Sequence, residues 1–251
     1  MESCDRVTDV LDTYLHIADI SDDSRNGLQV QGGEHVRRVV GLVDASREGF
    51  DAAIEADADM VIVHHGLFWS SPVRLTGVMY ERVRVLIEEG VSLYAAHLPL
   101  DAHEEVGNNA QLLSLLGAQP SGRYAEFAGT AIGYLGTYDE PRTLSEIAET
   151  LDRELRTQTR VYDFGPGEIT TVGVISGSAC DALGATCDAG ADVFVTGEPR
   201  LSAYHEARER EINVAFAGHY ATETVGIKAL LEKLPMLCDV ETQFIDVPCD
   251  I

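Results

Sequence analysis

The stretch Asp59-Met-Val-Ile-Val-His-His-Gly66 decides the fold of this chain of 251 residues. Its short, uninterrupted apolar run predicts a strand buried on both faces, which is typical of parallel sheets covered by helices. His64 and His65 follow at the carboxyl end of that strand, where α/β sheets place their ligand-binding residues. Because imidazole nitrogens bind many transition metals, the stretch predicts an α/β protein with a metal site at this strand end.

The two histidines are adjacent, and adjacent side chains on a strand point to opposite faces. Both can serve one metal site only if the strand ends at the pair, and Gly66 allows the turn that this requires. The alternative is a structural role, with one histidine in the core and the other at the surface.

Apolar strand patterns alternate with helical patterns on both sides of this stretch. Strands are predicted at residues 36–43, 60–63, 91–96, 129–137, 212–217 and 242–247, and helices at 46–56, 79–89, 108–116, 144–155, 202–209 and 222–234. Asn26-Gly-Leu-Gln29 is predicted to be a turn. The alternation indicates mostly parallel sheets with helices on both faces.

A similar pair of strands occurs twice along the chain. Val39–Ser46 and Ala58–Val63 match Thr171–Ser178 and Ala191–Thr196, with an alanine-rich helical segment between the strands in each copy. The repeat predicts two similar α/β/α lobes that arose by internal duplication.

The first lobe is predicted to contain residues 1–122 and to be completed by about 210–251, and the second lobe, an inserted repeat, to contain 123–209. The second copy has Gly197-Glu198 at the place of His64-His65. The first lobe is therefore expected to carry most of the metal ligands.

Two further segments can complete the metal site. His97-Leu-Pro-Leu-Asp101 follows a predicted strand and ends in a carboxylate, and Gly218-His219-Tyr-Ala-Thr-Glu223 opens a predicted helix. Residues four apart lie on the same face of a helix, so His219 and Glu223 can reach the same ion. Histidines and carboxylates from three strand ends are enough for two metal ions that share a carboxylate.

Several other polar residues near these segments have two interpretations. His97 and His103 can orient a ligand or carry a proton. Asn108 can cap a helix or position a substrate, and Asp44 is interpreted as a helix cap first and a site residue second. Ser176-Gly-Ser178 resembles a nucleophile motif, but no histidine accompanies it in its repeat.

The net charge of −24 sets the classes of partner that the chain can bind. Lysine occurs only at positions 228 and 233. An acidic surface repels nucleic-acid phosphates and anionic membranes, so neither is expected as a partner. Because salt screens the repulsion between carboxylates, the composition favours a halophilic source, the alternative being an acidic protein from an ordinary cytoplasm.

Cysteine use and hydropathy indicate the compartment. The five cysteines are scattered and include no Cys-x-x-Cys pair, which argues against a disulfide framework and for a reducing cytoplasm. The amino terminus has no basic and apolar signal pattern, and no run approaches the roughly 20 apolar residues of a membrane helix. We therefore expect a cytoplasmic protein.

At these segments the chain closely resembles the NIF-three-like dinuclear-metal-centre family, whose members include type 2 homologues of GTP cyclohydrolase I. The matching motifs are Asn26-Gly-Leu-Gln29, Val63-His-His-Gly66, His97-Leu-Pro-Leu-Asp101, Gly107-Asn-Asn109, Thr196-Gly-Glu198 and Gly218-His-Tyr-Ala-Thr-Glu223. The resemblance implies a two-lobed α/β fold and a ring-shaped homohexamer. It also implies five metal ligands, of which Glu223 touches both ions: His64, His65, Asp101, His219 and Glu223.

Two functions from different classes follow from this set. The first is a metal-dependent hydrolase with two divalent ions per chain, acting on a nucleotide or phosphoester and similar to type 2 GTP cyclohydrolase, with His97 and His103 as candidate proton carriers. The second is a metal-binding scaffold or regulatory protein without turnover. Mixed nitrogen and oxygen ligands fit Zn, Mn, Fe or Ni, so the metal stays open.

Overall fold

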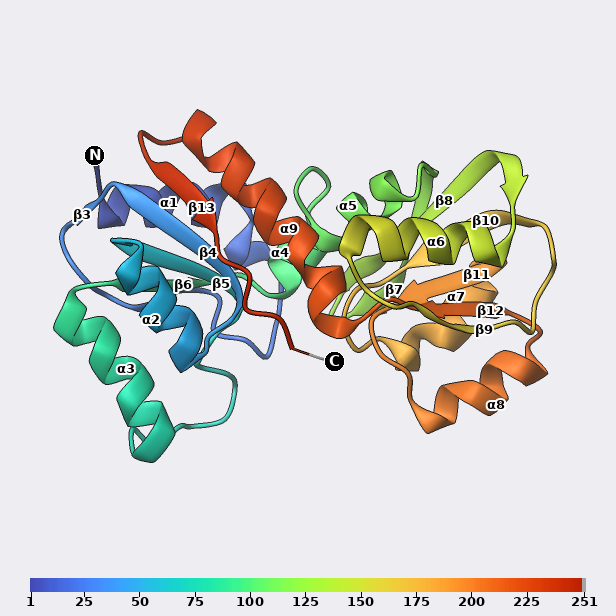
Figure 1. Cartoon of the computed structure of the whole chain (residues 1–251), viewed down its shortest axis with the longest axis horizontal. Coiled ribbons are helices and arrows are strands. Elements are labelled where there is room, and N and C mark those ends of the chain that lie inside the picture. Colours follow the sequence, from blue (N-terminus) through green and yellow to red (C-terminus); the bar gives the residue numbers. More distant parts are fainter. Residues whose placement is uncertain (250–251) are drawn as a thin grey trace. The chain divides into compact units, whose positions relative to one another are not determined.

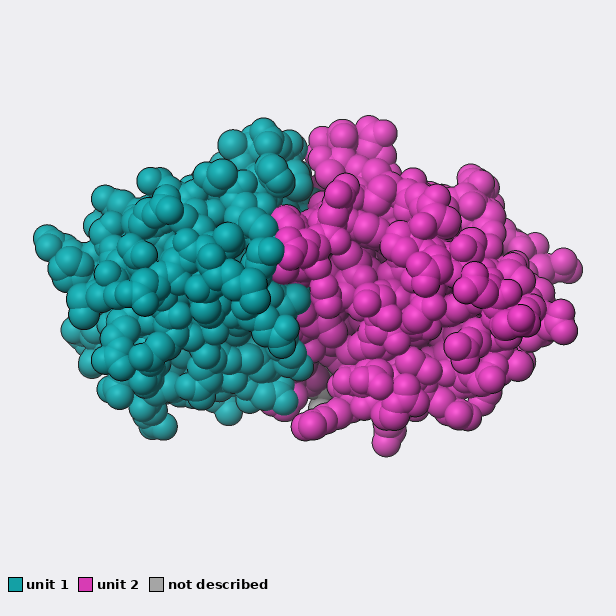
Figure 2. Space-filling view, turned by 90° about the horizontal axis from the view of Figure 1, so that it is seen from above, with its two compact units in different colours: residues 1–100, 226–247 teal, residues 101–225, 248–251 magenta. Residues whose placement is uncertain are grey.

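The protein is described from a computed structural model, and the structure describes residues 1–249. The chain divides into two compact units, coloured separately in Figure 2. Unit 1 contains Met1–Leu100 and Gly226–Val247, and unit 2 contains Asp101–Val225 and the residues after Val247. The lobe boundaries predicted at 122 and about 210 both fall inside unit 2, and residues 250–251 of the predicted first lobe lie outside the described part of the chain.

Unit 1 is built on a five-stranded sheet (Figure 1). Its strand order is β13 (Glu241–Phe244), β4 (Arg38–Asp44), β5 (Met60–His65), β6 (Ser92–Ala95) and β2 (Gly27–Val30). Neighbouring strands are parallel except for β2, which pairs antiparallel with β6. Unit 1 also contains a separate two-stranded antiparallel sheet, formed by β1 (Glu2–Ser3) and β3 (His35–Val36). The predicted turn at residues 26–29 is wrong, because this segment forms the edge strand β2.

Alternation along β4 explains why both faces of this sheet are covered. Val40 and Leu42 share a buried cluster with residues of α2 (Arg47–Glu55) and α3 (Gly77–Glu89). Gly41 faces the other way, where a Cβ atom would lie 2.5 Å from a methyl group of Leu231 in α9 (His219–Lys233). On that face the Tyr94 hydroxyl also donates to Asp12 of α1 (Cys4–Tyr14), at 2.8 Å.

Unit 2 is built on a six-stranded sheet with more antiparallel than parallel pairings. Its strand order is β7 (Gln119–Phe127), β8 (Thr130–Arg142), β10 (Ile169–Val174), β11 (Val193–Thr196), β12 (Asn213–Phe216) and β9 (Arg160–Tyr162). Only β10, β11 and β12 run parallel to one another. The expectation of mostly parallel sheets therefore holds for unit 1 and not for unit 2.

A hairpin is the physical reason for the difference. Phe127 pairs with Thr130, and the two residues between them, Ala128 and Gly129, both have positive φ, 47° and 91°. Two-residue turns with this backbone join antiparallel strands whose twist they match. The lobe boundary predicted after residue 122 therefore falls inside β7.

Helices cover both faces of the second sheet as well. Val193 and Val195 pack with α5 (Asn108–Leu115) and α6 (Leu144–Leu155), whereas Phe194 packs with α7 (Leu183–Asp188) and α8 (Leu201–Glu209). Each unit is thus a mixed α/β unit in three layers, and the segment β10-α7-β11 has the same element order as β4-α2-β5. That the two arose by duplication stays a prediction.

The remaining elements are short. They are the helix α4 (Leu98–Ala102) and the 3-10 turns at Ile17–Asp19, Cys180–Ala182 and Leu234–Met236. Among residues 1–249, none of the helices has the length and apolar character needed to cross a membrane.

Candidate metal centre

Three histidines lie together in unit 1. His64 and His65 are the last two residues of β5, and His97 follows β6, the next strand of the sheet. The ring centroids are 4.7 Å apart for His64 and His65, 5.0 Å for His64 and His97, and 5.6 Å for His65 and His97. One ring nitrogen from each histidine lies within 4.8 Å of the others, close enough for a shared ion. As expected, the strand ends at His65, directly before Gly66.

All three imidazoles are oriented in the same way. Nδ1 of His64 lies 2.9 Å from the Ala96 carbonyl, Nδ1 of His65 lies 2.9 Å from Asp44 Oδ1, and Nδ1 of His97 lies 3.0 Å from both Asp22 carboxylate oxygens. Because carbonyls and ionised carboxylates only accept hydrogen bonds, Nδ1 is the protonated nitrogen in each ring. The neutral ring then has its lone pair on Nε2, as in histidines that bind metals in proteins.

Asp22 is the residue that holds His97. Its side chain is 2% exposed, and it also accepts hydrogen bonds from the Leu98 amide at 3.0 Å and from Asn26 Nδ2 at 2.8 Å. Burial raises the pKa of Asp22, but the hydrogen bonds from His97, Asn26 and the Ser24 amide lower it and bring this pKa to about 2. Asp22 is therefore a carboxylate that fixes the His97 ring.

The turn after the histidine pair depends on Gly66. A Cβ atom at this position would lie 2.5 Å from Gln29 Nε2 and 2.7 Å from the Ala95 methyl group. Gln29 Oε1 accepts the Leu67 amide at 2.7 Å, so β2 holds the turn in place. Trp69 follows and stands edge-on to the His97 ring at 5.1 Å between centroids.

Three more predicted ligands lie in unit 2. Asp101 is in α4, and His219 and Glu223 are on the first turns of α9. His219 Nε2 lies 3.2 Å from Glu223 Oε1, which confirms that the spacing of four residues brings both to one face of the helix. His219 Nδ1 lies 3.6 Å from Glu198 Oε1. The Asp101 and Glu223 side chains are buried, with residue exposures of 6% and 3%.

His103 and Asn108 both take part in local hydrogen bonds, and the predicted role of His103 as a proton carrier stays a prediction. His103 Nδ1 accepts the amides of Glu105 and Val106, at 3.2 and 3.1 Å, so this nitrogen stabilises the turn before α5. Gly107, not Asn108, is the N-cap of α5. Asn108 is buried instead, and its Nδ2 donates to Asp101 Oδ1 at 2.8 Å. The prediction of Asn108 as a helix cap is wrong because the side chain pairs with a carboxylate.

Sequence reasoning missed Asp22 and Trp69 and ranked Asp44 as a helix cap first. Asp22 and His97 are separated by 75 residues, and the only local signal was the polar run Ser21-Asp-Asp-Ser24 before Asn26. Asp44 accepts from His65 because the register of β4 and β5 places the two residues opposite each other. Such pairings depend on sheet register, which periodicity alone does not fix.

The donor chemistry fits divalent transition metals. Histidine nitrogens and carboxylate oxygens are ligands for zinc, manganese, iron and nickel. In unit 1 three imidazoles converge, and in unit 2 a histidine and a buried carboxylate stand in contact. The residues present therefore fit metal ions, and the fit does not select one element.

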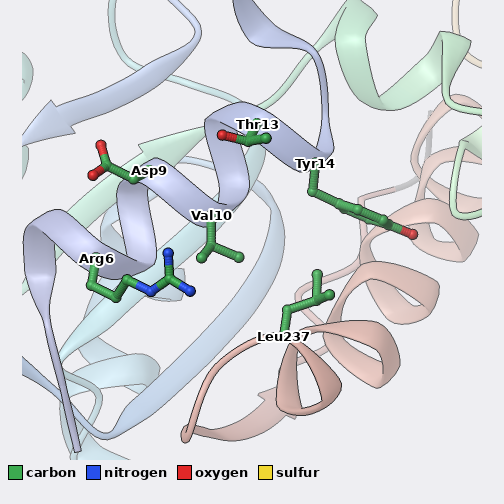
Figure 3. A pocket seen from close by; sticks show the side chains of 6 residues that line it. All are labelled: Arg6, Asp9, Val10, Thr13, Tyr14 and Leu237. Atoms are coloured by element: carbon green, nitrogen blue, oxygen red, sulfur yellow. The ribbon is translucent and has the colours of Figure 1, made fainter.

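A separate hollow of about 360 Å³ lies along α1 in unit 1 (Figure 3). It is lined by Arg6, Asp9, Val10, Thr13, Tyr14 and Leu237. None of these is a histidine or a candidate ligand, so this hollow is not part of the candidate metal centre.

The fold and these residues define a mixed α/β protein with a candidate metal centre of histidines and carboxylates. The chain belongs to the Duf34/NIF3 (NGG1p interacting factor 3) family, whose model matches residues 3–250.

Relatives cover nearly the whole chain. A protein of Archaeoglobus fulgidus named GTP cyclohydrolase 1 type 2 homolog is 43% identical over 241 residues, 96% of each chain. A protein of the same name from Halobacterium salinarum is 40% identical over 96% of this chain and 98% of its own.

Two solved structures have the same fold over the full length of both chains. The protein ybgI, described as of unknown function, superposes with a TM-score of 0.93 at 36% identity. The protein TTHA1606 from Thermus thermophilus superposes with a TM-score of 0.91 at 41% identity.

Proposed function

We propose that the protein is a metal-dependent hydrolase that acts on a nucleotide or phosphoester and binds two divalent ions per chain. The proposed ligands are His64, His65, Asp101, His219 and Glu223, with Glu223 shared between the ions. Relatives named GTP cyclohydrolase 1 type 2 homolog support GTP as the first substrate to test.

The common orientation of the three histidines in unit 1 carries this proposal. Each Nδ1 is held by a carbonyl or carboxylate, and partners of this kind orient metal-binding imidazoles and make them more basic. A set of unrelated structural histidines would not be expected to repeat this arrangement three times on adjoining strand ends.

The path of the chain supports one centre with two ions. The chain passes from unit 1 to unit 2 between Leu100 and Asp101, and back between Val225 and Gly226. Asp101 follows His97 by four residues, and Glu223 precedes the second crossing by two. Along the sequence, Asp101 and Glu223 are thus within two residues of the points where the chain passes between the units.

Two divalent ions would supply Lewis-acid activation of water and attraction for an anionic substrate. The protein supplies the proton transfer. His97 is oriented by Asp22 with its proton on Nδ1, so its Nε2 can accept a proton from the attacking water and return it to a leaving group. Trp69 stands edge-on to the His97 ring.

The function is tested with metal-reconstituted protein at high salt against GTP, other nucleotides and phosphoesters. Turnover that requires added metal and is absent from the His65→Ala variant supports the hydrolase. Two tightly bound ions with no turnover on any substrate would instead support the second candidate, a metal-binding scaffold.

We also propose that the chain assembles as a homohexameric ring, as its resemblance to the family implies, and that it is cytoplasmic, as its scattered cysteines indicate. Sedimentation equilibrium at high salt tests the assembly, and a single-chain mass would contradict it.

A further inference from the structure

Three candidate ligands of unit 2 meet one short loop, Ser176-Gly177-Ser178, which lies beyond the end of β10. Ser176 contacts Asp101, and Gly177 lies against His219 and Glu223. The loop backbone is held on both sides: the Ser176 amide donates to Asn109 Oδ1 at 2.7 Å, and the Gly177 amide donates to Thr222 Oγ1 at 3.0 Å.

Gly177 is required for the close approach. Its φ is +62°, a region that disfavours residues with a Cβ atom. A Cβ atom here would clash with Glu223 Oε1 and lie 3.1 Å from His219 Nε2. The loop therefore contacts Asp101 and both candidate ligands of α9, His219 and Glu223.

Two hydrogen bonds reach the same oxygen of the Asp101 carboxylate. Ser176 Oγ donates to Oδ1 at 3.0 Å, and Asn108 Nδ2 donates to Oδ1 at 2.8 Å. All three residues are buried. The donors approach from different segments, so they fix the rotation of the carboxylate about its Cβ–Cγ bond and direct Oδ2 away from them.

We propose that Ser176 is a positioning residue that, together with Asn108, makes Asp101 bind its metal ion through Oδ2 alone. The proposal rests on the metal centre proposed above and assigns a use to the motif that looked like a nucleophile in the sequence. An oxygen that already accepts two hydrogen bonds has less electron density for a metal, and hydrogen bonds to ligands are typically worth about 10–100-fold in metal affinity.

The test compares the full-length wild type with Ser176→Ala and Ser176→Thr, each loaded with cobalt(II). Ser178→Ala is the matched control, because Ser178 lies on the same loop and accepts from Arg200 at 2.8 Å. Dissociation constants and the visible absorption of bound cobalt are measured, and circular dichroism checks that each variant is folded.

Ser176→Ala is expected to bind one of the two cobalt ions about 10–100-fold more weakly. Its visible absorption should also fall, because a carboxylate free to bind through both oxygens raises the coordination number of the ion. Ser176→Thr keeps the hydroxyl and should restore the spectrum, and Ser178→Ala should match the wild type.

If Ser176→Thr does not fold, Asn108→Ala replaces it and should change the spectrum in the same direction as Ser176→Ala. The positioning role is overturned if the wild type binds two cobalt ions and the spectrum of Ser176→Ala is unchanged. This holds whatever the cobalt affinity of the variant. A wild type that binds no cobalt contradicts the proposed metal centre itself.

Discussion

His65 and His97 are neighbours in space, but substituting each of them is expected to affect turnover and metal content differently. His65→Ala removes a proposed metal ligand and should abolish turnover. His97→Ala removes the proposed proton carrier and should slow turnover by about 10²–10⁴-fold with the metal content unchanged. Turnover and elemental content are measured on the same samples. Equal activity in the wild type and both variants would place the hydrolysis at another site or in a contaminant.

Glu223 is expected to matter for both ions because it is the proposed shared ligand. Glu223→Ala should lose most of both ions, measured by elemental analysis after dialysis. Glu232→Ala is the matched control, since Glu232 is an exposed residue on the same helix. Two ions per chain retained by Glu223→Ala would contradict the shared position.

Asp22 gives a dependence of stability on pH. Its folded pKa is about 2 against 3.8 for the ordinary carboxyl, so the stabilisation is complete above pH 3.8 and is lost as the pH falls through about 2. Asp22→Asn should lower the free energy of unfolding at pH 7 by about 1–3 kcal/mol. The difference from the wild type should shrink between about pH 4 and pH 2, as followed by urea unfolding. A difference that stays constant over this range would contradict the assignment.

At the scale of elements, the N-cap of α6 can be tested directly. Thr143 is the N-cap of this helix and forms a capping box with Glu146. Thr143→Ala should lower the free energy of unfolding by about 1 kcal/mol. Ser145→Ala is the control and should stay within about 0.5 kcal/mol of the wild type in urea unfolding. Equal losses would contradict the capping role.

Elements with a buried apolar pattern and a local cap could be predicted from the sequence. The apolar run of β5 and the helical pattern of α2, which Ser46 caps, are examples, and both elements end within a few residues of the predicted positions. Two of the edge strands, β2 and β7, could not be predicted, because both are only partly buried and begin with glycine or contain proline. The candidate ligands were recognised from their types and spacing, whereas Asp22 depends on a contact across 75 residues that no local pattern shows.

For the whole molecule, the net charge of −24 predicts a response to salt. Repulsion between surface carboxylates is screened as ionic strength rises, and a ring of subunits would add to the repulsion. The melting temperature is therefore expected to rise with KCl up to the molar range. Scanning calorimetry at several KCl concentrations checks this, with sucrose as a neutral control. A flat or falling curve would remove the halophilic interpretation.

The discontinuity of unit 1 has a consequence for synthesis on the ribosome. Unit 2 is almost entirely one continuous segment, Asp101–Val225, whereas unit 1 needs Gly226–Val247 to be complete. Until those residues emerge, β4 lacks its neighbour β13, and Gly41 lacks its cover of Ile227 and Leu231. Chains grow at about 5–20 residues per second, so unit 2 can fold before residues 226–247 are made. During that time the β4 edge of the sheet in the first hundred residues has no partner strand. A chain that stops before Gly226 would keep that edge exposed and should aggregate through it.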